Sequence, residues 1–307
     1  MNMQMIHAHK HITTFFTSVS TERQKNGASL LVKSLRSFGG SLSHCPIWIF
    51  TDDRQPTLDE YLIGDGVQVL PLYLPETIKD YWFAAKVVAC ARAEELASSA
   101  EQSLVWMSTD SLIVKPPLLF DLKNEYDVAL RPVHIRNIGS PATKPLDDFW
   151  RFIYETLRVQ DNQSVVKSFV DDQLLRPYFN SHALSINPSM GIMRRWYEYF
   201  EWLVGNHAFQ SGLCQDELHR IFLHQAVLST LLQSMIEPER MRLLPDDYSY
   251  PYNLHAKVPK VKRAQALNDL VCFTYEDRSL HPDAVADIEI KDPLKSWLSE
   301  LLVPQEE

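Results

Sequence analysis

The chain has 307 residues, enough for one large α/β domain or two small ones. It is 45% hydrophobic and 22% charged, as in an ordinary globular protein, and it contains neither G-x-x-x-x-G-K nor G-x-G-x-x-G, which disfavours P-loop and dinucleotide-binding proteins. The formal net charge of −9 disfavours nucleic acid as a partner.

The first half of the sequence alternates between strand and helix patterns. Short apolar runs predict strands, and apolar residues at helical spacing predict helices between them. Such alternation favours an α/β fold with a mainly parallel central sheet, helices on both faces and a Rossmann-like N-terminal half. The expected strands are 12–19, 46–50, 66–72, 103–107 and 112–114, and the expected helices are 27–38 and 80–97.

The second half continues the pattern less regularly. We find no linker, repeat or low-complexity segment in it, so we expect one domain over residues 1–307. The expected strands are 127–130, 182–186, 241–244 and 270–275, and the expected helices are 145–158, 164–175, 190–204, 216–234 and 292–302.

The cysteines and the N-terminal residues indicate in which cellular compartment the protein is expected. Cys45, Cys90, Cys214 and Cys272 are far apart and show no C-x-x-C spacing, which argues against a metal cluster. Residues 1–16 lack the sustained apolar run of a signal peptide, and no segment approaches the ~18 apolar residues of a membrane span. We therefore expect a cytoplasmic protein without structural disulfides or a transmembrane segment.

The most informative segment is 103–117, SLVWMSTDSLIVKPP. A short apolar run is interrupted by the polar residues 108–111 and then resumes until Lys115 and two prolines end it. Asp110 is thus a lone carboxylate at the carboxyl end of a strand, where open α/β sheets bind their ligands. The same residue could instead simply stabilise the turn.

This segment resembles the Asp-x-Asp region of glycosyltransferases with the GT-A fold. Those proteins place an apolar strand, Asp-x-Asp and a second apolar strand in succession, and the two aspartates hold a divalent metal against the diphosphate of a nucleotide sugar. Here the motif is degenerate, because Ser108-Thr109-Asp110 keeps only the second acid. A hydroxyl is a weaker ligand for hard cations than a carboxylate.

Weaker similarities follow in the same order along the chain. The segment Tyr81-Trp82-Phe83-Ala84-Ala85-Lys86, which precedes the motif, resembles an aromatic-x-x-Lys helix of the family, with Phe83 and Lys86 at that spacing. Residues 179–187 resemble a Phe-Asn-Ser-Gly segment in which His182 replaces the glycine. His224-Gln225 resembles an Asp-Gln pair that has lost its acid. Together with a Leu-Pro…Tyr-Asn turn, these similarities cover roughly residues 12–275.

The resemblance implies a GT-A-like fold with a nucleotide-binding half at about 12–135 and an acceptor half at about 136–307. The implied donor is a nucleotide diphosphate sugar, and the acceptor is left open. The residues expected at the donor are Thr17, Ser18, Asp52, Lys86, Ser108 and Arg131. Asp110 is expected to be catalytic and, with His255, to hold Mn²⁺ or Mg²⁺. Where no metal binds, lysine and arginine would supply the positive charge instead.

Transfer to an acceptor with inversion needs a base, and two acidic residues are candidates. Asp216 and Glu217 open the expected helix 216–234, where some GT-A members place an acid. Carboxylates in a first turn also complement the helix dipole, which by itself accounts for both residues. Asp171-Asp172 is a rival acidic pair.

Two alternatives belong to other functional classes. The replaced residues at 108, 182 and 224 are compatible with a GT-A-fold binding or scaffold protein that has lost its chemistry. A nucleotidyltransferase is the second alternative, but it would require a glycine-rich loop after the first strand, and residues 20–26 do not provide one.

Overall fold

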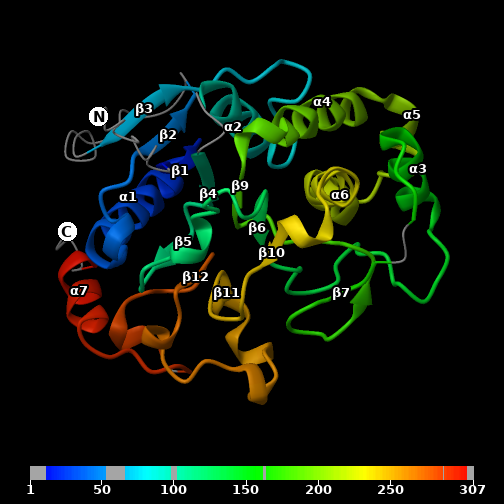
Figure 1. Cartoon of the computed structure of the whole chain (residues 1–307). Helices are drawn as coiled ribbons and strands as arrows, with labels where there is room; N and C mark the ends of the chain where they lie inside the picture. The colour runs from blue at the N-terminus through cyan, green and yellow to red at the C-terminus, as the bar shows by residue number, and fades with distance from the viewer. Residues whose placement is uncertain (1–11, 53–65, 98–101, 162–163, 286, 303–307) are drawn as a thin grey trace, which may run out of the picture.

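The computed structural model describes residues 12–52, 66–97, 102–161, 164–285 and 287–302. Within them, the largest sheet has seven strands in the order β10-β6-β9-β4-β1-β2-β3 (Figure 1). Strands β1 to β4 run parallel to one another, through the pairs β1–β2, β1–β4 and β2–β3, whereas β9 runs antiparallel to both β4 and β6. The mainly parallel sheet expected from the sequence is therefore confirmed. Its strands are β1 Ile12–Val19, β2 Ile47–Thr51, β3 Val67–Pro71, β4 Gln102–Met107, β6 Val128–Leu130, β9 Ala183–Ile186 and β10 Met241–Leu243.

Period-two alternation along the strands builds a helical layer on each face of the sheet. Phe15 packs into one apolar cluster with Leu31 and Leu35 of α1 (Glu22–Phe38). Its neighbour Phe16 faces the other side and packs with residues of the remaining large helices. These helices are α2 Ala84–Leu96, α3 Asp148–Leu157, α4 Ile192–Gly205 and α6 Glu217–Met235.

Smaller elements complete the C-terminal half. A second sheet has the strand order β11-β12-β5, and its strands are β5 Ser111–Ile113, β11 Tyr250–Pro251 and β12 Cys272–Thr274. The helix α7 (Leu294–Leu301) lies beside α1, where Trp297 contacts the Phe38 ring (Figure 1). A short helix, α5 (His207–Ser211), follows α4.

The prediction of a helix at 164–175 is wrong. This segment forms an antiparallel pair, β7 Val166–Lys167 and β8 Leu174–Leu175. The Ser168 hydroxyl donates to Asp171 and accepts from the Gln173 amide, so side chains close a turn at the expense of helical hydrogen bonds. Asp172 adopts a positive φ of 54°, which ends any helical path there.

Two helix starts also differ from the sequence expectation. The helix α1 begins at Glu22 and not at 27, because the Thr21 hydroxyl accepts from the Gln24 amide while the Gln24 side chain accepts from the Ser20 amide. These contacts resemble a capping box, which the sequence pattern T-x-x-Q at Thr21–Gln24 indicates. The helix α2 begins later than expected, because Phe83 at its N-cap has a left-handed φ of 61°.

Gly27 lets α1 pack directly on the turn that carries Asp110. A Cβ atom added at Gly27 would lie 2.3 Å from the Thr109 carbonyl oxygen, so no side chain fits between the helix and this turn. A glycine inside a helix costs about 1 kcal/mol relative to alanine. That cost is offset here by a close approach that fixes the turn at the end of β4.

All four cysteines are free thiols, as expected. Among the described residues, no helix is both long enough and apolar enough to cross a membrane. Most of the N-terminal segment in which we expected no signal peptide, residues 1–11, lies outside the described residues.

Candidate functional site

A cavity of about 530 Å³ opens at the carboxyl ends of β1, β2 and β4. The strand order reverses beside β1, and open α/β sheets bind ligands in the crevice at such a reversal. Four of the residues expected at the donor line this cavity together: Ser18, Asp52, Lys86 and Ser108. Parallel pairing of β1 with β2 and β4 is what brings these separate segments to one edge of the sheet.

Lys86 is a buried ammonium group in the wall of the cavity. Its side chain is 6% exposed, and Nζ donates to the carbonyl and hydroxyl oxygens of Ser181 at 3.2 and 3.1 Å. It also lies 4.6 Å from the centre of the Phe83 ring. Within the described residues Lys86 forms no ion pair, and burial lowers its pKa from 10.5 to about 8 although Cys90 and Asp110 oppose the shift. A buried cation without a carboxylate partner is suited to an anionic ligand.

The N-terminal end of α2 lies in the same wall. Ala84, Ala85 and Lys86 line the cavity, and no side chain caps the helix at Phe83. The first amide groups of a helix lack intrahelical acceptors and carry partial positive charge, so they bind phosphate oxygens. Lys86 and this helix end therefore present positive charge to the same space.

Aromatic side chains form the rim of the cavity. Trp82 and Phe83 line it while remaining 48% and 42% exposed. The Phe83 ring also packs against the His224 ring, with a centroid distance of 4.4 Å and the two planes tilted by 33°. His224 Nε2 lies 3.1 Å from the Ser181 hydroxyl, so the ring contact connects the rim to the residues that hold Lys86. Burial, reinforced by Lys86, lowers the pKa of His224 well below its usual value and keeps the imidazole neutral.

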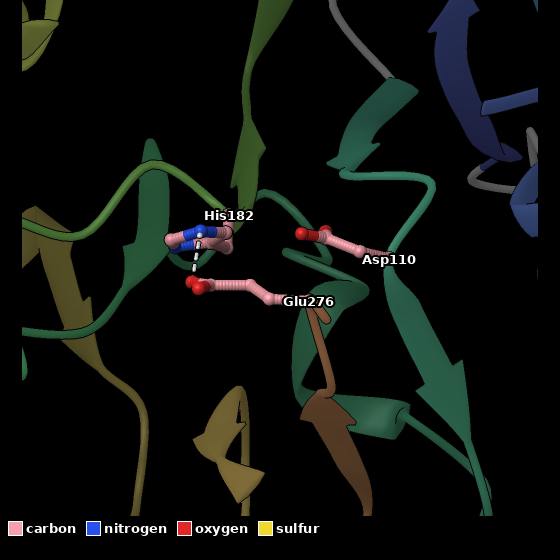
Figure 2. A group of neighbouring side chains, drawn as sticks. All are labelled: Asp110, His182 and Glu276. Atoms are coloured by element: carbon pink, nitrogen blue, oxygen red, sulfur yellow. Dashed lines mark ion pairs between the residues drawn. The ribbon is translucent and has the colours of Figure 1, made fainter. Parts of the chain in front are cut away.

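Asp110, His182 and Glu276 converge beside the cavity (Figure 2). Their ligand atoms all lie within 4.8 Å of one another, and His182 Nε2 is 3.5 Å from Glu276 Oε1. Asp110 lies in the turn between β4 and β5, His182 directly before β9, and Glu276 soon after β12. Ser108 and Thr109, which line the cavity, immediately precede Asp110.

Burial shifts two members of this cluster in opposite directions. The pKa of His182 falls to about 4, mainly through burial and against the pull of Asp110, so its ring is neutral at pH 7. The pKa of Glu276 is raised, first by burial and then by the Asp110 charge. The three residues thus offer a neutral imidazole nitrogen and two acidic side chains that repel each other.

The residues of this cluster fit a divalent cation. Carboxylates and imidazole are ligands for ions such as Mn²⁺. Asp110 Oδ1 is buried and has no hydrogen-bond partner among the described residues, which is unusual for a buried oxygen. A cation beside this oxygen would satisfy it and offset the repulsion between the two acids.

Two residues expected at the donor do not line the cavity. Thr17 shares a face of β1 with Phe15 and therefore points toward α1. Arg131 is 2% exposed and donates to the carbonyl oxygens of Asp246 and Tyr248 and to the Asp246 carboxylate, at 2.8 to 3.0 Å. Its guanidinium group holds the segment after β10 in place.

The other expected residues are also engaged elsewhere. Asp216 is the N-cap of α6, where its carboxylate accepts from the amide and the ring of His219, and Glu217 is exposed in the first turn. The dipole interpretation of these acids accounts for both positions. His255 is 1% exposed and its Nδ1 lies 2.8 Å from the Tyr250 hydroxyl. It does not belong to the cluster around Asp110.

Sequence reasoning did not find His182 and Glu276 as partners of Asp110. In the sequence, His182 was noted only because it replaces a glycine of the family pattern. A side chain gained at that position was the available signal that His182 belongs to the site. Glu276 follows the last expected strand, and an acid at that strand end was the available signal.

Solved structures with the same fold are glycosyltransferases. The apo structure of the bifunctional glycosyltransferase WbbM is similar with a TM-score of 0.56 at 12% identity, over 89% of this chain and 47% of that one. An active-site mutant of LgtC is similar with a TM-score of 0.50 at 10% identity, over 94% of both chains. No curated protein matches the chain. The fold is accordingly that of GT-A-type glycosyltransferases.

A narrower assignment comes from the sequence family. Residues 15–235 match the model of the Rhodobacterales glycosyltransferase domain. The chain belongs to this family. The matched region contains the whole cavity lining as well as Asp110 and His182, whereas Glu276 lies beyond it.

Proposed function

We propose that this protein transfers a sugar from a nucleotide diphosphate donor whose diphosphate binds at Lys86 and the N-terminal end of α2. The observation that carries the proposal is the buried Lys86 ammonium group, which forms no ion pair within the described residues and lines the cavity at the strand-order reversal. Two phosphate groups supply the negative charge that this wall lacks. The negative charge of a diphosphate bound there would also offset the loss of hydration that lowers the pKa of Lys86.

The nucleoside would occupy the part of the cavity formed by the ends of β1 and β2. Ser18, Ser20 and Asp52 place hydroxyl and carboxylate oxygens there, which can accept hydrogen bonds from ribose hydroxyl groups and base N–H groups. Trp82 offers a flat, half-exposed apolar surface for a base or a sugar face.

Departure of the nucleotide diphosphate develops negative charge that the protein must stabilise. Lys86 donates hydrogen bonds from a site with little water, where such charge stabilisation is strongest. A divalent cation at Asp110 would supply further charge neutralisation at the diphosphate. Ser181 and Phe83 hold the Lys86 ammonium group in place before the donor binds.

Nucleotide binding and donor hydrolysis test this proposal. Thermal unfolding should be measured with UDP, GDP and ADP, each with and without MnCl₂, followed by hydrolysis of UDP-sugars and GDP-sugars. We expect at least one diphosphate to raise the melting temperature and its sugar derivative to be hydrolysed. Asp110→Asn, which keeps the size of the side chain and removes its charge, should lower the hydrolysis rate by about 100-fold or more.

Three outcomes would contradict the proposal in different ways. If no nucleotide shifts the melting temperature, the donor site is wrong. Binding without hydrolysis or transfer would identify a binding protein that retains the fold. Full activity of Asp110→Asn would remove the role assigned to Asp110.

A further inference from the structure

A positively charged loop, residues 257–263, differs from the acidic remainder of the chain. Its sequence is KVPKVKR, with four positive side chains, and residues 248–268 contain no acidic residue. The whole chain has a formal net charge of −9. At physiological ionic strength, exposed charges more than about 8 Å apart are largely screened from each other. The basic loop therefore presents a positive surface despite the net charge of the protein.

The lysines of the basic loop are mostly available to a partner. Lys257 and Lys260 are exposed, and within the described residues neither side chain forms an ion pair or a hydrogen bond. Lys262 does pair with Asp172, at 2.6 Å, but this carboxylate is shared with Lys167 at 2.9 Å. One acid thus faces two lysines, so the positive charge of the loop is only partly neutralised.

An apolar side chain projects from the middle of this charge. Val261 lies in a short 3₁₀ helix, Lys260–Lys262, and is 94% exposed, more than any other large apolar side chain that the structure describes. A soluble polyanion gains nothing from such a residue, whereas the interface of a lipid bilayer accepts apolar side chains. Flanking lysines can then lay their apolar stems along the acyl chains and keep their ammonium groups at the lipid phosphates.

The rest of the protein holds the backbone of the basic loop in place. The Arg263 guanidinium group donates to the carbonyl oxygens of Ala256 and Val258 at 2.9 and 2.8 Å. The Val258 side chain is 1% exposed and packs into the apolar cluster beneath the loop. Val261 is therefore displayed on an ordered turn, and binding would not first have to overcome the entropy of ordering that turn.

We propose that the basic loop docks this protein on the surface of an anionic lipid bilayer, with Val261 inserted between the headgroups and Lys257 and Lys260 at the lipid phosphates. Charge complementarity supplies the attraction, and the exposed valine favours a bilayer over a soluble polyanion. The binding is weak, reversible and sensitive to salt, because the loop offers few charges and one small apolar side chain. This inference does not depend on the proposed sugar transfer.

Sedimentation of the full chain with sucrose-loaded vesicles tests the proposal. Vesicles of phosphatidylcholine alone should be compared with vesicles that also contain phosphatidylglycerol, each at low and at high NaCl concentration. We expect binding to the phosphatidylglycerol vesicles only, and less of it at high salt, since salt screens the attraction.

Lys257→Gln/Lys260→Gln removes the two lysines that have no partner within the described residues. We expect the partition coefficient onto anionic vesicles to fall about 25-fold, since each lysine near the surface contributes about fivefold. Lys123→Gln/Lys295→Gln is the matched control, because it changes the net charge equally and both of its lysines are exposed outside the loop. The control should change the partition coefficient by less than about twofold.

Substitutions of Val261 distinguish a bilayer from a polyanion. Val261→Asp should lower the partition coefficient about tenfold, and Val261→Trp should raise it about threefold or more, because tryptophan favours the membrane interface. Neither change disturbs the core, since the side chain is 94% exposed, and thermal unfolding checks that each variant is folded. Retention on a heparin column provides the comparison with a soluble polyanion.

Three outcomes would overturn the proposal. The first is no binding to phosphatidylglycerol vesicles at low salt. The second is an equal loss of binding in the loop variant and in its matched control, which would assign the attraction to net charge. The third is vesicle binding that neither Val261 variant alters, together with strong retention on heparin, which would identify a surface for soluble polyanions.

Discussion

Two buried cations of this protein have opposite surroundings. Lys86 and Arg131 are 6% and 2% exposed, and the sequence resemblance led us to expect both at the donor. Arg131 has its own carboxylate at 2.9 Å and two backbone carbonyl groups. Among the described residues, the hydrogen-bond acceptors of Lys86 are the two oxygens of Ser181, and the lysine lines a cavity. Burial of a cation therefore does not by itself indicate a ligand site, whereas burial beside a cavity and without a carboxylate partner favours one.

Of the variants considered, Arg131→Met should have the largest effect, and this effect should be on the free energy of unfolding. This change leaves the buried Tyr248 carbonyl group and the partly buried Asp246 carbonyl group without their donor, and a buried group left unsatisfied is costly. We expect the free energy of unfolding to fall by about 3 kcal/mol, measured by urea denaturation. At a temperature where the variant is folded, its nucleotide affinity should stay within about threefold of the wild type. Loss of nucleotide binding by the folded variant would place Arg131 at the donor after all.

Lys86→Met should instead lower nucleotide affinity without destabilising the protein. Removal of a buried charge without an ion-pair partner should leave the free energy of unfolding unchanged or raise it. Nucleotide diphosphate affinity should fall about 100-fold, since a hydrogen bond to a charged group contributes about 1.5–3 kcal/mol.

Lys79→Met is the matched control for Lys86→Met. Lys79 also lines the cavity, but its ammonium group already lies 2.7 Å from Glu76. We expect the nucleotide affinity of this control to change by less than about threefold. If calorimetry shows equal losses of nucleotide affinity in both lysine variants, the specific role of Lys86 is wrong and general attraction by positive charge explains the binding.

The smallest effect is a pH dependence that only Lys86 should produce. Its pKa of about 8 means that the ammonium form is lost as the pH rises through this value, so nucleotide affinity should fall above pH 8 by at most about tenfold per pH unit. In the ligand-free protein the free energy of unfolding should instead rise from about pH 8 to 10.5, because the unfolded chain binds more protons over that range. A profile that is the same in Lys86→Met would assign the effect to another group.

The sequence predicted the sheet better than the connections between its elements. Buried strands such as β1 and β4 are short apolar runs, and their pattern does not depend on distant residues. The segment 164–175 was misassigned because its apolar spacing also fits a helix. The turn formed by Ser168 and Asp172 depends on side-chain hydrogen bonds and a positive φ that spacing does not report.

The candidate site was predictable where a strand end defines the position. Asp52, Ser108 and Asp110 each follow a strand of the parallel sheet, so sequence order alone brings them to one edge. Arg131 also follows a strand, but whether it reaches a ligand depends on Asp246, which is distant in sequence and was not predictable as its partner. Glu276 and His182 are also distant in sequence, so their contact was not predictable either.

The position of Glu276 also bears on the order in which the site can form during synthesis. Ribosomal translation delivers the cavity residues and Asp110 first, then His182, and Glu276 only after the second sheet has acquired β12. The backbone bond from Tyr275 to Asp110 can close only at that stage. A nascent chain would thus contain every residue of the cavity lining before Glu276 can join Asp110 and His182.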